Sequence, residues 1–149
     1  EKNIVKKYKY GIVPHFKDKY AVGIQKILAL KNPEIKIIDI QSGNEEFIVD
    51  VLSCENILSS SLHGLILAET YGIPTCHVKF SENLIGGDFK FYDYYSGVGI
   101  KKIETVVIND DISRLKNIFS KCSLKDLNFD KKALKDSLID YVNQNSKAL

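Results

Sequence analysis

Short runs rich in valine and isoleucine recur along the chain and alternate with amphipathic segments. Five of these runs are short enough to be strands: residues 8–16, 35–40, 56–60, 75–80 and 104–108. Runs this apolar suit a parallel sheet that is covered by helices on both faces. The alternation therefore predicts an α/β fold of the Rossmann-like, doubly wound class, with a parallel sheet of about five strands.

The segments between these runs have the apolar spacing of helices. Residues 18–30 show one apolar face, and residues 42–52 begin with the capping pattern S-x-x-E. Residues 63–71 are followed by Gly72, which is typical of the residue after a helix. Residues 63–71 are apolar almost all round, which indicates a helix at the centre of the domain. Two further amphipathic helices are expected near the C-terminus, with inward-facing residues Ile112, Leu115, Ile118 and Phe119 in the first and Leu134, Leu138, Tyr141 and Val142 in the second.

Length and composition limit the chain to one folded unit, residues 1–149. It has 149 residues, of which 44% are hydrophobic and 27% charged, and a net charge of +2 from scattered lysines, so no nucleic-acid arm is expected. No apolar run is long enough to span a membrane. Cys54, Cys76 and Cys122 are odd in number and lie in apolar surroundings, which favours reduced thiols and a soluble, cytoplasmic protein. Because the chain starts at Glu1 and lacks methionine, we expect a longer protein with a further domain.

The stretch "ILSSSLHGLILAETYGIP", residues 57–74, places a polar cluster between a predicted strand and a predicted helix. Ser59, Ser60, Ser61 and His63 fall in this turn. The N-terminus of a helix offers free backbone N–H groups and a positive dipole end, which favour a phosphate or carboxylate. The turn is therefore a candidate anion site, and helix capping by Ser61 alone is the alternative.

His15 ends the first predicted strand, in the sequence "PHF". If the strand order is 2-1-3-4-5, the ligand crevice lies between the first and third strands, and His15 would share it with the turn at 59–63. An imidazole beside a bound dianion can give or take a proton near neutral pH. We expect His77, within the fourth strand, to be buried and structural, and Glu69 to be a buried or interdomain carboxylate.

Other catalytic and cofactor motifs are absent from the sequence. There is no GxGxxG, no GxxxxGK[ST] and no G-x-S-x-G, and no spacing of cysteine and histidine suits zinc. We therefore expect neither a metal nor a bound cofactor. The segment "IGGDFKFYDYYSGVG", residues 85–99, is long for a connector, so it is either functional or carries a short helix of its own.

Three blocks, "GIVPHFKDK", "ILSSSLHGLILAETYGIP" and "FKFYDYYSGVG", resemble in this order the C-terminal half of the polysaccharide pyruvyl transferase family. They span residues 11–99. The resemblance implies that the chain is the second Rossmann-like domain of a two-domain enzyme with a glycosyltransferase B-type arrangement, whose N-terminal domain is missing here. It also implies transfer of pyruvate from phosphoenolpyruvate to two hydroxyls of a glycan or lipid-linked sugar, as a ketal, in exopolysaccharide or cell-surface glycan biosynthesis. Such an enzyme would be cytoplasmic, free or associated with the inner face of the membrane.

The resemblance also implies roles for individual residues. His63 would be the acid/base on the phosphate side of the donor, and His15 a second proton carrier or a phosphate ligand. The donor would be bound by Ser59, Ser60, Ser61, Gly64 and Lys17. Tyr92, Asp93, Tyr94 and Tyr95 would line the acceptor side, and a loop packed by its own tyrosines is the alternative.

One position departs from the family pattern. Many members carry an arginine at the position of Ser61, and the only arginine here, Arg114, falls in a terminal helix. Neutralising the phosphate would then fall to backbone amides, the serines, and Lys17 or Lys90.

Two other classes of function stay open. One is a nucleotide-sugar glycosyltransferase or epimerase domain, in which the same turn binds a diphosphate and Glu69 approaches a ribose. The other is a non-catalytic Rossmann-like module that holds a partner domain.

Overall fold

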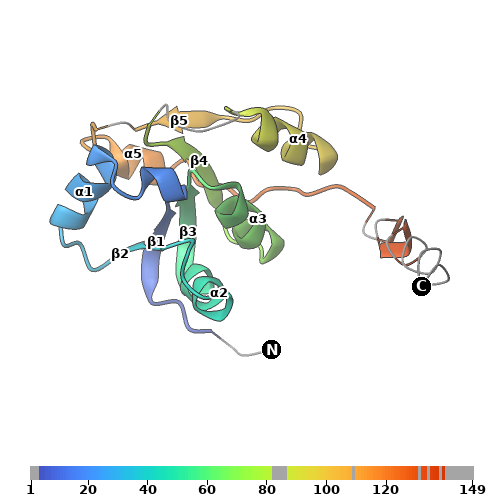
Figure 1. Ribbon diagram of the computed structural model, residues 1–149, viewed down its shortest axis with the longest axis horizontal. Coiled ribbons are helices and arrows are strands. Elements are labelled where there is room, and N and C mark those ends of the chain that lie inside the picture. The colour runs from blue at the N-terminus through green and yellow to red at the C-terminus, as the bar shows by residue number, and fades with distance from the viewer. Residues whose placement is uncertain are drawn as a thin grey trace.

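Five strands form one parallel sheet in the computed structural model, which describes residues 4–81, 87–108, 110–130, 132, 133, 135–137 and 139 (Figure 1). The strands are β1 (Tyr8–Val13), β2 (Ile35–Ile37), β3 (Cys54–Ser59), β4 (Thr75–Lys79) and β5 (Thr105–Val107). Their order is β2-β1-β3-β4-β5, and every neighbouring pair is parallel. The Rossmann-like α/β class and the predicted strand order are both confirmed.

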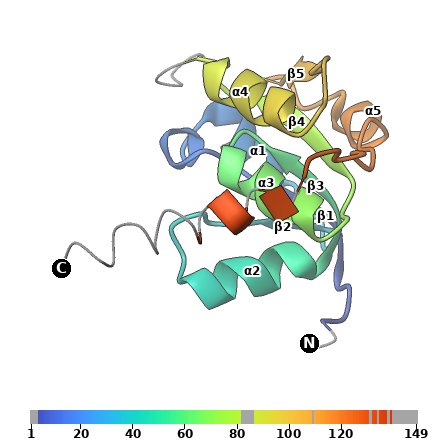
Figure 2. The ribbon, with the colours of Figure 1, turned by 90° about the vertical axis from the view of Figure 1, so that its right-hand side faces the viewer.

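Helices connect the strands, a further helix follows the last strand, and together they cover the sheet on both faces. They are η1 (Phe16–Asp18, a 3₁₀ turn), α1 (Val22–Ala29), α2 (Asn44–Leu52), α3 (Leu62–Thr70), α4 (Phe89–Gly97) and α5 (Leu115–Phe119). Figure 1 shows α1 and α5 on one side of the sheet and α2, α3 and α4 on the other, and Figure 2 looks onto the second group. No helix in the described ranges is long and apolar enough to cross a bilayer.

Alternating strand residues supply the cores on the two faces. Ile12 and Leu58 pack with the buried side chains of α1 and α5, whereas Val13 and Ile57 pack with those of α2 and α3. This period of two is what a strand dictates, because successive side chains point to opposite faces. A third cluster joins α3 to α4 through Leu65, Phe91, Tyr95 and Val98. Helix α3 is therefore packed against strands and helices, as its apolar sequence predicted.

Two sequence predictions need correction. The first strand ends at Val13 rather than at residue 16, because Pro14 has no N–H for the ladder and the chain then turns into η1, with the Asp18 N–H donating to the His15 carbonyl (2.7 Å). The S-x-x-E pattern is not a capping box. Gly43 is the N-cap of α2, and the Ser42 hydroxyl instead donates to the Asp39 carbonyl (2.8 Å).

Other sequence predictions are confirmed. The long segment before β5 carries a helix of its own, α4, and Leu115, Ile118 and Phe119 are buried in α5. Gly72 follows α3 with a φ of 66°, the left-handed conformation in which glycine ends a helix without strain. The residues predicted to face inward from a last helix, Leu134, Leu138, Tyr141 and Val142, lie outside the described residues.

The three cysteines are free thiols. Cys54 and Cys76 are buried and Cys122 is half-buried. Burial raises the pKa of Cys54 to about 11 and that of Cys122 to about 12, and it also raises the pKa of Cys76. Thiols with such pKa values stay protonated near neutral pH, so their role is packing.

Candidate functional site

The carboxyl ends of β1 and β3 meet at one edge of the sheet. These strands pair in register, with Val13 opposite Ser59, so the segments that follow them start side by side. His15 follows β1, and the turn at 59–63 follows β3. The predicted convergence of the two is confirmed by direct contact, because the His15 backbone N–H donates to the Ser60 hydroxyl (2.9 Å).

Ser59 fixes the shape of the turn. Its side chain is fully buried, and its Oγ accepts a hydrogen bond from the Ser61 N–H (3.0 Å). The same Oγ lies within hydrogen-bond distance of two carbonyls, those of Val13 (3.0 Å) and Ser61 (2.7 Å), and its single proton goes to one of them at a time. Ser59 therefore ties the turn to the end of β1, and its role is structural.

Gly64 allows the start of α3 to approach the sheet closely. A Cβ at this position would lie 2.6 Å from the Ser59 Oγ and 2.8 Å from a methyl carbon of Val13. Both distances are well inside van der Waals contact, so any larger side chain would push the helix away from the two strand ends. Glycine is required here by packing.

Asp18 is a buried carboxylate that joins three segments at this edge. It is 0% exposed and accepts hydrogen bonds from the hydroxyls of Ser60 (2.9 Å) and Ser81. Since the Ser60 hydroxyl also receives the His15 N–H, a continuous chain of hydrogen bonds runs from Asp18 through Ser60 to His15. Sequence reasoning placed Asp18 at a helix start and missed both Asp18 and Ser81 as site residues. The one signal was a carboxylate three positions after His15, and its burial appears only in three dimensions.

The N-terminus of α3 has polar groups that are not bonded within the helix. Ser61 is the N-cap residue, and its carbonyl accepts the first helical hydrogen bond, from the Leu65 N–H (3.2 Å). The three N–H groups before Leu65 therefore have no partner within the helix. The Ser61 hydroxyl makes no capping bond and, although the residue is only 1% exposed, has no hydrogen-bond partner among the described residues. Capping by Ser61 alone does not explain this hydroxyl.

Charged neighbours act on His15. Burial lowers the pKa of its imidazole, and the positive charge of Lys90 lowers it further, while Asp18 acts in the opposite direction. Lys17 and His63 also lower the pKa of His15, by less than Lys90 does. All of these groups therefore lie within electrostatic reach of His15. Lys90, in the first turn of α4, acts more strongly than Lys17 at this edge, and the excess of positive charge favours an anion.

The two histidines differ in setting. The Nδ1 of His15 accepts the Lys17 N–H across 3.4 Å, which places the proton of the neutral ring on Nε2. The ring of His15 is half-buried and lies 4.5 Å from the ring of Phe16. His63 is exposed in the first turn of α3, next to the N–H groups that have no partner within the helix. Its side chain is thus available to a molecule bound there.

His77 and Glu69 are buried, as predicted. Burial lowers the pKa of His77 to about 4; its Nδ1 is 3.0 Å from the Thr105 hydroxyl, and its ring stacks on Phe91. The two carboxylate oxygens of Glu69 accept three hydroxyl hydrogen bonds, from Thr75 (2.7 Å), Tyr94 (2.9 Å) and Tyr95 (2.7 Å).

Of the four residues proposed for the acceptor side, Tyr92, Asp93, Tyr94 and Tyr95, only the last two bond to Glu69. Tyr94 and Tyr95 turn their hydroxyls toward Glu69 of α3, and burial, followed by the charge of Glu69, raises the pKa of both phenols. Tyr92 and Asp93 lie exposed on the same helix, α4. The structure therefore does not bring the four together on one surface.

A separate open cavity of about 480 Å³ lies beside η1 and the end of β4. It is lined by Lys17, Tyr20, Ala21, Val22, Phe80, Ser81 and Asp110.

A metal centre has no support in the described parts of the chain, where no cluster of three or more histidine, cysteine, aspartate or glutamate side chains could hold a metal ion.

Comparison with known proteins gives little functional information. No protein-family model matches the chain. An uncharacterized protein of Acanthamoeba polyphaga mimivirus is similar, with 40% identity over 97 residues, which is 64% of this chain and 33% of that protein. The chain thus spans about a third of the length of this relative.

Proposed function

We propose that this chain is the C-terminal half of a pyruvyl transferase, which binds phosphoenolpyruvate at the N-terminus of α3. The observation that carries the proposal is the buried Ser61 hydroxyl without a partner in the described part of the chain, beside three N–H groups that have no partner within the helix. A phosphate group would accept hydrogen bonds from these donors and would be favoured by the helix dipole. The resemblance of three sequence blocks to the transferase family supports the choice of donor.

The charges at the edge suit a donor of this kind. Ser61 stands where many family members have arginine, so the compensating charge has to come from elsewhere. Lys90 acts on His15 more strongly than Lys17 does, and it lies at the first turn of α4. We assign Lys90 as the main cation for the phosphate, with the amides of α3 and the serine hydroxyls as neutral donors.

The chemistry needs protons at two places. A proton added to the methylene carbon of phosphoenolpyruvate leaves positive charge at the neighbouring carbon, which a sugar hydroxyl attacks while its own proton passes to a base. Phosphate then leaves with the electrons of its C–O bond, a second sugar hydroxyl attacks the resulting oxocarbenium carbon, and its proton passes to a base to complete the ketal. His63 would act on the phosphate side, and His15, held by the Ser60–Asp18 chain, would be the second proton carrier.

The acceptor sugar would need room near His15. The open cavity beside η1 offers an exposed aromatic ring, Tyr20, and the polar side chains of Ser81 and Asp110, a combination that suits a sugar. We therefore propose that the acceptor binds on the η1 side of the donor rather than at Tyr94 and Tyr95, whose hydroxyls bind Glu69.

Ligand-induced stabilisation tests the class of function. Phosphoenolpyruvate should raise the melting temperature of the chain more than pyruvate or uridine diphosphate does, because a ligand that binds only the folded state stabilises it. A larger shift with uridine diphosphate would favour the nucleotide-sugar alternative. No shift with any phosphate compound, in wild type or in a Ser61→Arg variant, would favour a non-catalytic module.

Turnover should require more than this chain. If the active site lies between two domains, most contacts that position the acceptor are missing, so we expect weak donor binding and no release of phosphate by the isolated chain. Phosphate release by this chain alone, in the presence of an acceptor glycan, would contradict the two-domain arrangement.

A further inference from the structure

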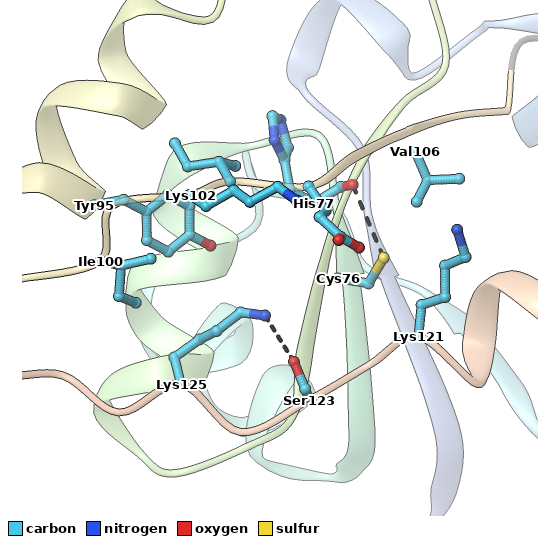
Figure 3. Close-up of a pocket in the computed structure, with 11 residues that line it drawn as sticks. Cys76, His77, Tyr95, Ile100, Lys102, Val106, Lys121, Ser123 and Lys125 are labelled. Carbon is cyan, nitrogen blue, oxygen red and sulfur yellow. Dashed lines mark hydrogen bonds between the residues drawn. The ribbon is translucent and has the colours of Figure 1, made fainter.

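A second cavity, of about 240 Å³, lies at the other edge of the sheet, beside the amino ends of β4 and β5 (Figure 3). Residues from the start of β4, from 100–106 and from 121–125 line it. Ser123 pairs with Thr75, the first residue of β4, through two backbone hydrogen bonds of 2.9 and 3.1 Å. This pairing fixes the segment after α5 against the sheet, so the cavity has a defined wall.

The polar lining of this cavity is mainly cationic. It contains the side chains of Lys102, Lys121 and Lys125 and one carboxylate, Glu104. None of the four forms an ion pair with another described residue, whereas Lys36 pairs with an aspartate at 2.6 Å elsewhere in the chain. The three ammonium groups therefore lie around one cavity without forming an ion pair in the described part of the protein.

Two of the lysines also affect a buried thiol in the lining of the cavity, that of Cys76. Lys125 is held in place because its Nζ donates to the Ser123 hydroxyl (2.8 Å; Figure 3). Cys76, which is 5% exposed, lies on the floor. Burial raises the pKa of its thiol, and the charges of Lys125 and Lys121 oppose that rise, while Glu104 adds to it. Both ammonium groups thus lie within electrostatic reach of a buried position.

We propose that this cavity binds a small organic phosphate, at a site separate from the N-terminus of α3. Three lysines line it, and their ammonium groups can bind a phosphate as point charges from several directions. Tyr95, Ile100 and Val106 provide an apolar wall for the carbon part of the ligand. The volume suits a molecule smaller than most drug-sized ligands. This inference does not depend on the proposed transferase activity.

Residue-resolved titration tests the site. Glycerol 3-phosphate is added to the ¹⁵N-labelled chain at constant ionic strength, with glycerol as the uncharged control, and the backbone amide signals are followed. The site predicts saturable shifts at Cys76, Thr105 and Ser123 that glycerol does not produce. Shifts that grow linearly without saturation, or that occur only at residues 60–64, would overturn it.

Charge variants sharpen the test in both directions. The double variant Lys121→Gln/Lys125→Gln should weaken binding by about tenfold, whereas Glu104→Gln should tighten it several-fold because it removes the one carboxylate of the lining. Lys101→Gln and Lys116→Gln are matched controls, since these exposed lysines do not line the cavity. Equal losses in the control variants would mean that the chain binds phosphate through its overall charge, and the proposed site would be wrong. Thermal unfolding of each variant checks that the fold is unchanged.

Discussion

The two ends of helix α3 differ in whether their buried polar side chains are hydrogen-bonded. Near its C-terminal end, Glu69 is buried and both of its carboxylate oxygens are bonded to hydroxyls of β4 and α4. At its N-terminal end, the Ser61 hydroxyl is buried without a partner among the described residues, and the next three backbone N–H groups have no partner within the helix. Because an unpaired buried donor costs stability, the first end holds the fold together and the second suits a ligand.

The largest effect is expected at the N-terminal end. If the proposed activity is correct, His63→Ala or His63→Gln in the full two-domain protein should lower kcat by about two to four orders of magnitude, the usual contribution of a positioned acid/base. The melting temperature should stay unchanged, because the imidazole is exposed. Steady-state kinetics with the natural acceptor provide the measurement. Near-normal turnover, or an unfolded variant, would mean that His63 is not the acid/base.

At the bonded end the expected loss is in stability. Glu69→Ala leaves three hydroxyls, those of Thr75, Tyr94 and Tyr95, without their acceptor, so the free energy of unfolding should fall by about 3 kcal/mol. Glu69→Gln keeps one oxygen acceptor and should lose less. Urea unfolding measures both values. If Glu69→Ala unfolded at the same urea concentration as the wild type, the contrast between the two ends of α3 would fail.

His77 of β4, which stacks on Phe91 of α4, should make stability depend on pH. Burial holds the pKa of His77 at about 4, against 6.5 in the unfolded chain. Between these values the unfolded state binds a proton that the folded state does not, so stability should fall as the pH drops from 6.5 to 4, by about 3 kcal/mol at most. His77→Gln should flatten that part of the profile. Urea unfolding at a series of pH values measures it, and an equal slope in both proteins would contradict the buried, neutral imidazole.

The smallest of these effects concerns Asp18. Asp18→Asn keeps the shape of the side chain but removes the charge that accepts the Ser60 and Ser81 hydroxyls, so we expect a loss of about 1–2 kcal/mol. The pKa of His15 should also fall, because Asp18 raises it. NMR titration of the His15 ring measures this shift. Asp39→Asn is a matched control, since Asp39 pairs with Lys19 at the surface; an equal change of the His15 pKa in both variants would show that Asp18 does not act on His15 directly.

The sheet can be predicted from the sequence because its determinants are local. Apolar runs mark the strands, and parallel order then brings the end of β1 next to the end of β3, which is why the sequence alone predicts that His15 and the serine turn lie together. The element boundaries are harder to predict, since Pro14 ends β1 early and Ser42 bonds to a carbonyl instead of capping α2.

The partners of the buried carboxylates could not be predicted. Asp18 bonds to residues 42 and 63 positions away, and Glu69 bonds to tyrosines 25 and 26 positions away. The sequence predicted the burial of Glu69, which lies on the apolar helix α3, but not its bonding partners. It predicted neither the burial nor the partners of Asp18. The same limit applies to Tyr94 and Tyr95, whose hydroxyl direction depends on how α4 packs against α3.

The most direct test of the account is a titration of phosphoenolpyruvate into the ¹⁵N-labelled chain. We predict saturable shifts of the amides at residues 61–64 and of the His15 and His63 rings, weakened several-fold by Ser61→Ala, which removes a hydrogen bond worth about 1 kcal/mol, and strengthened by Ser61→Arg. Residue-resolved shifts also separate this site from the lysine-lined cavity. If the amides at 61–64 do not respond to saturating ligand, or if Ser61→Arg does not tighten binding, the N-terminus of α3 is not the donor site.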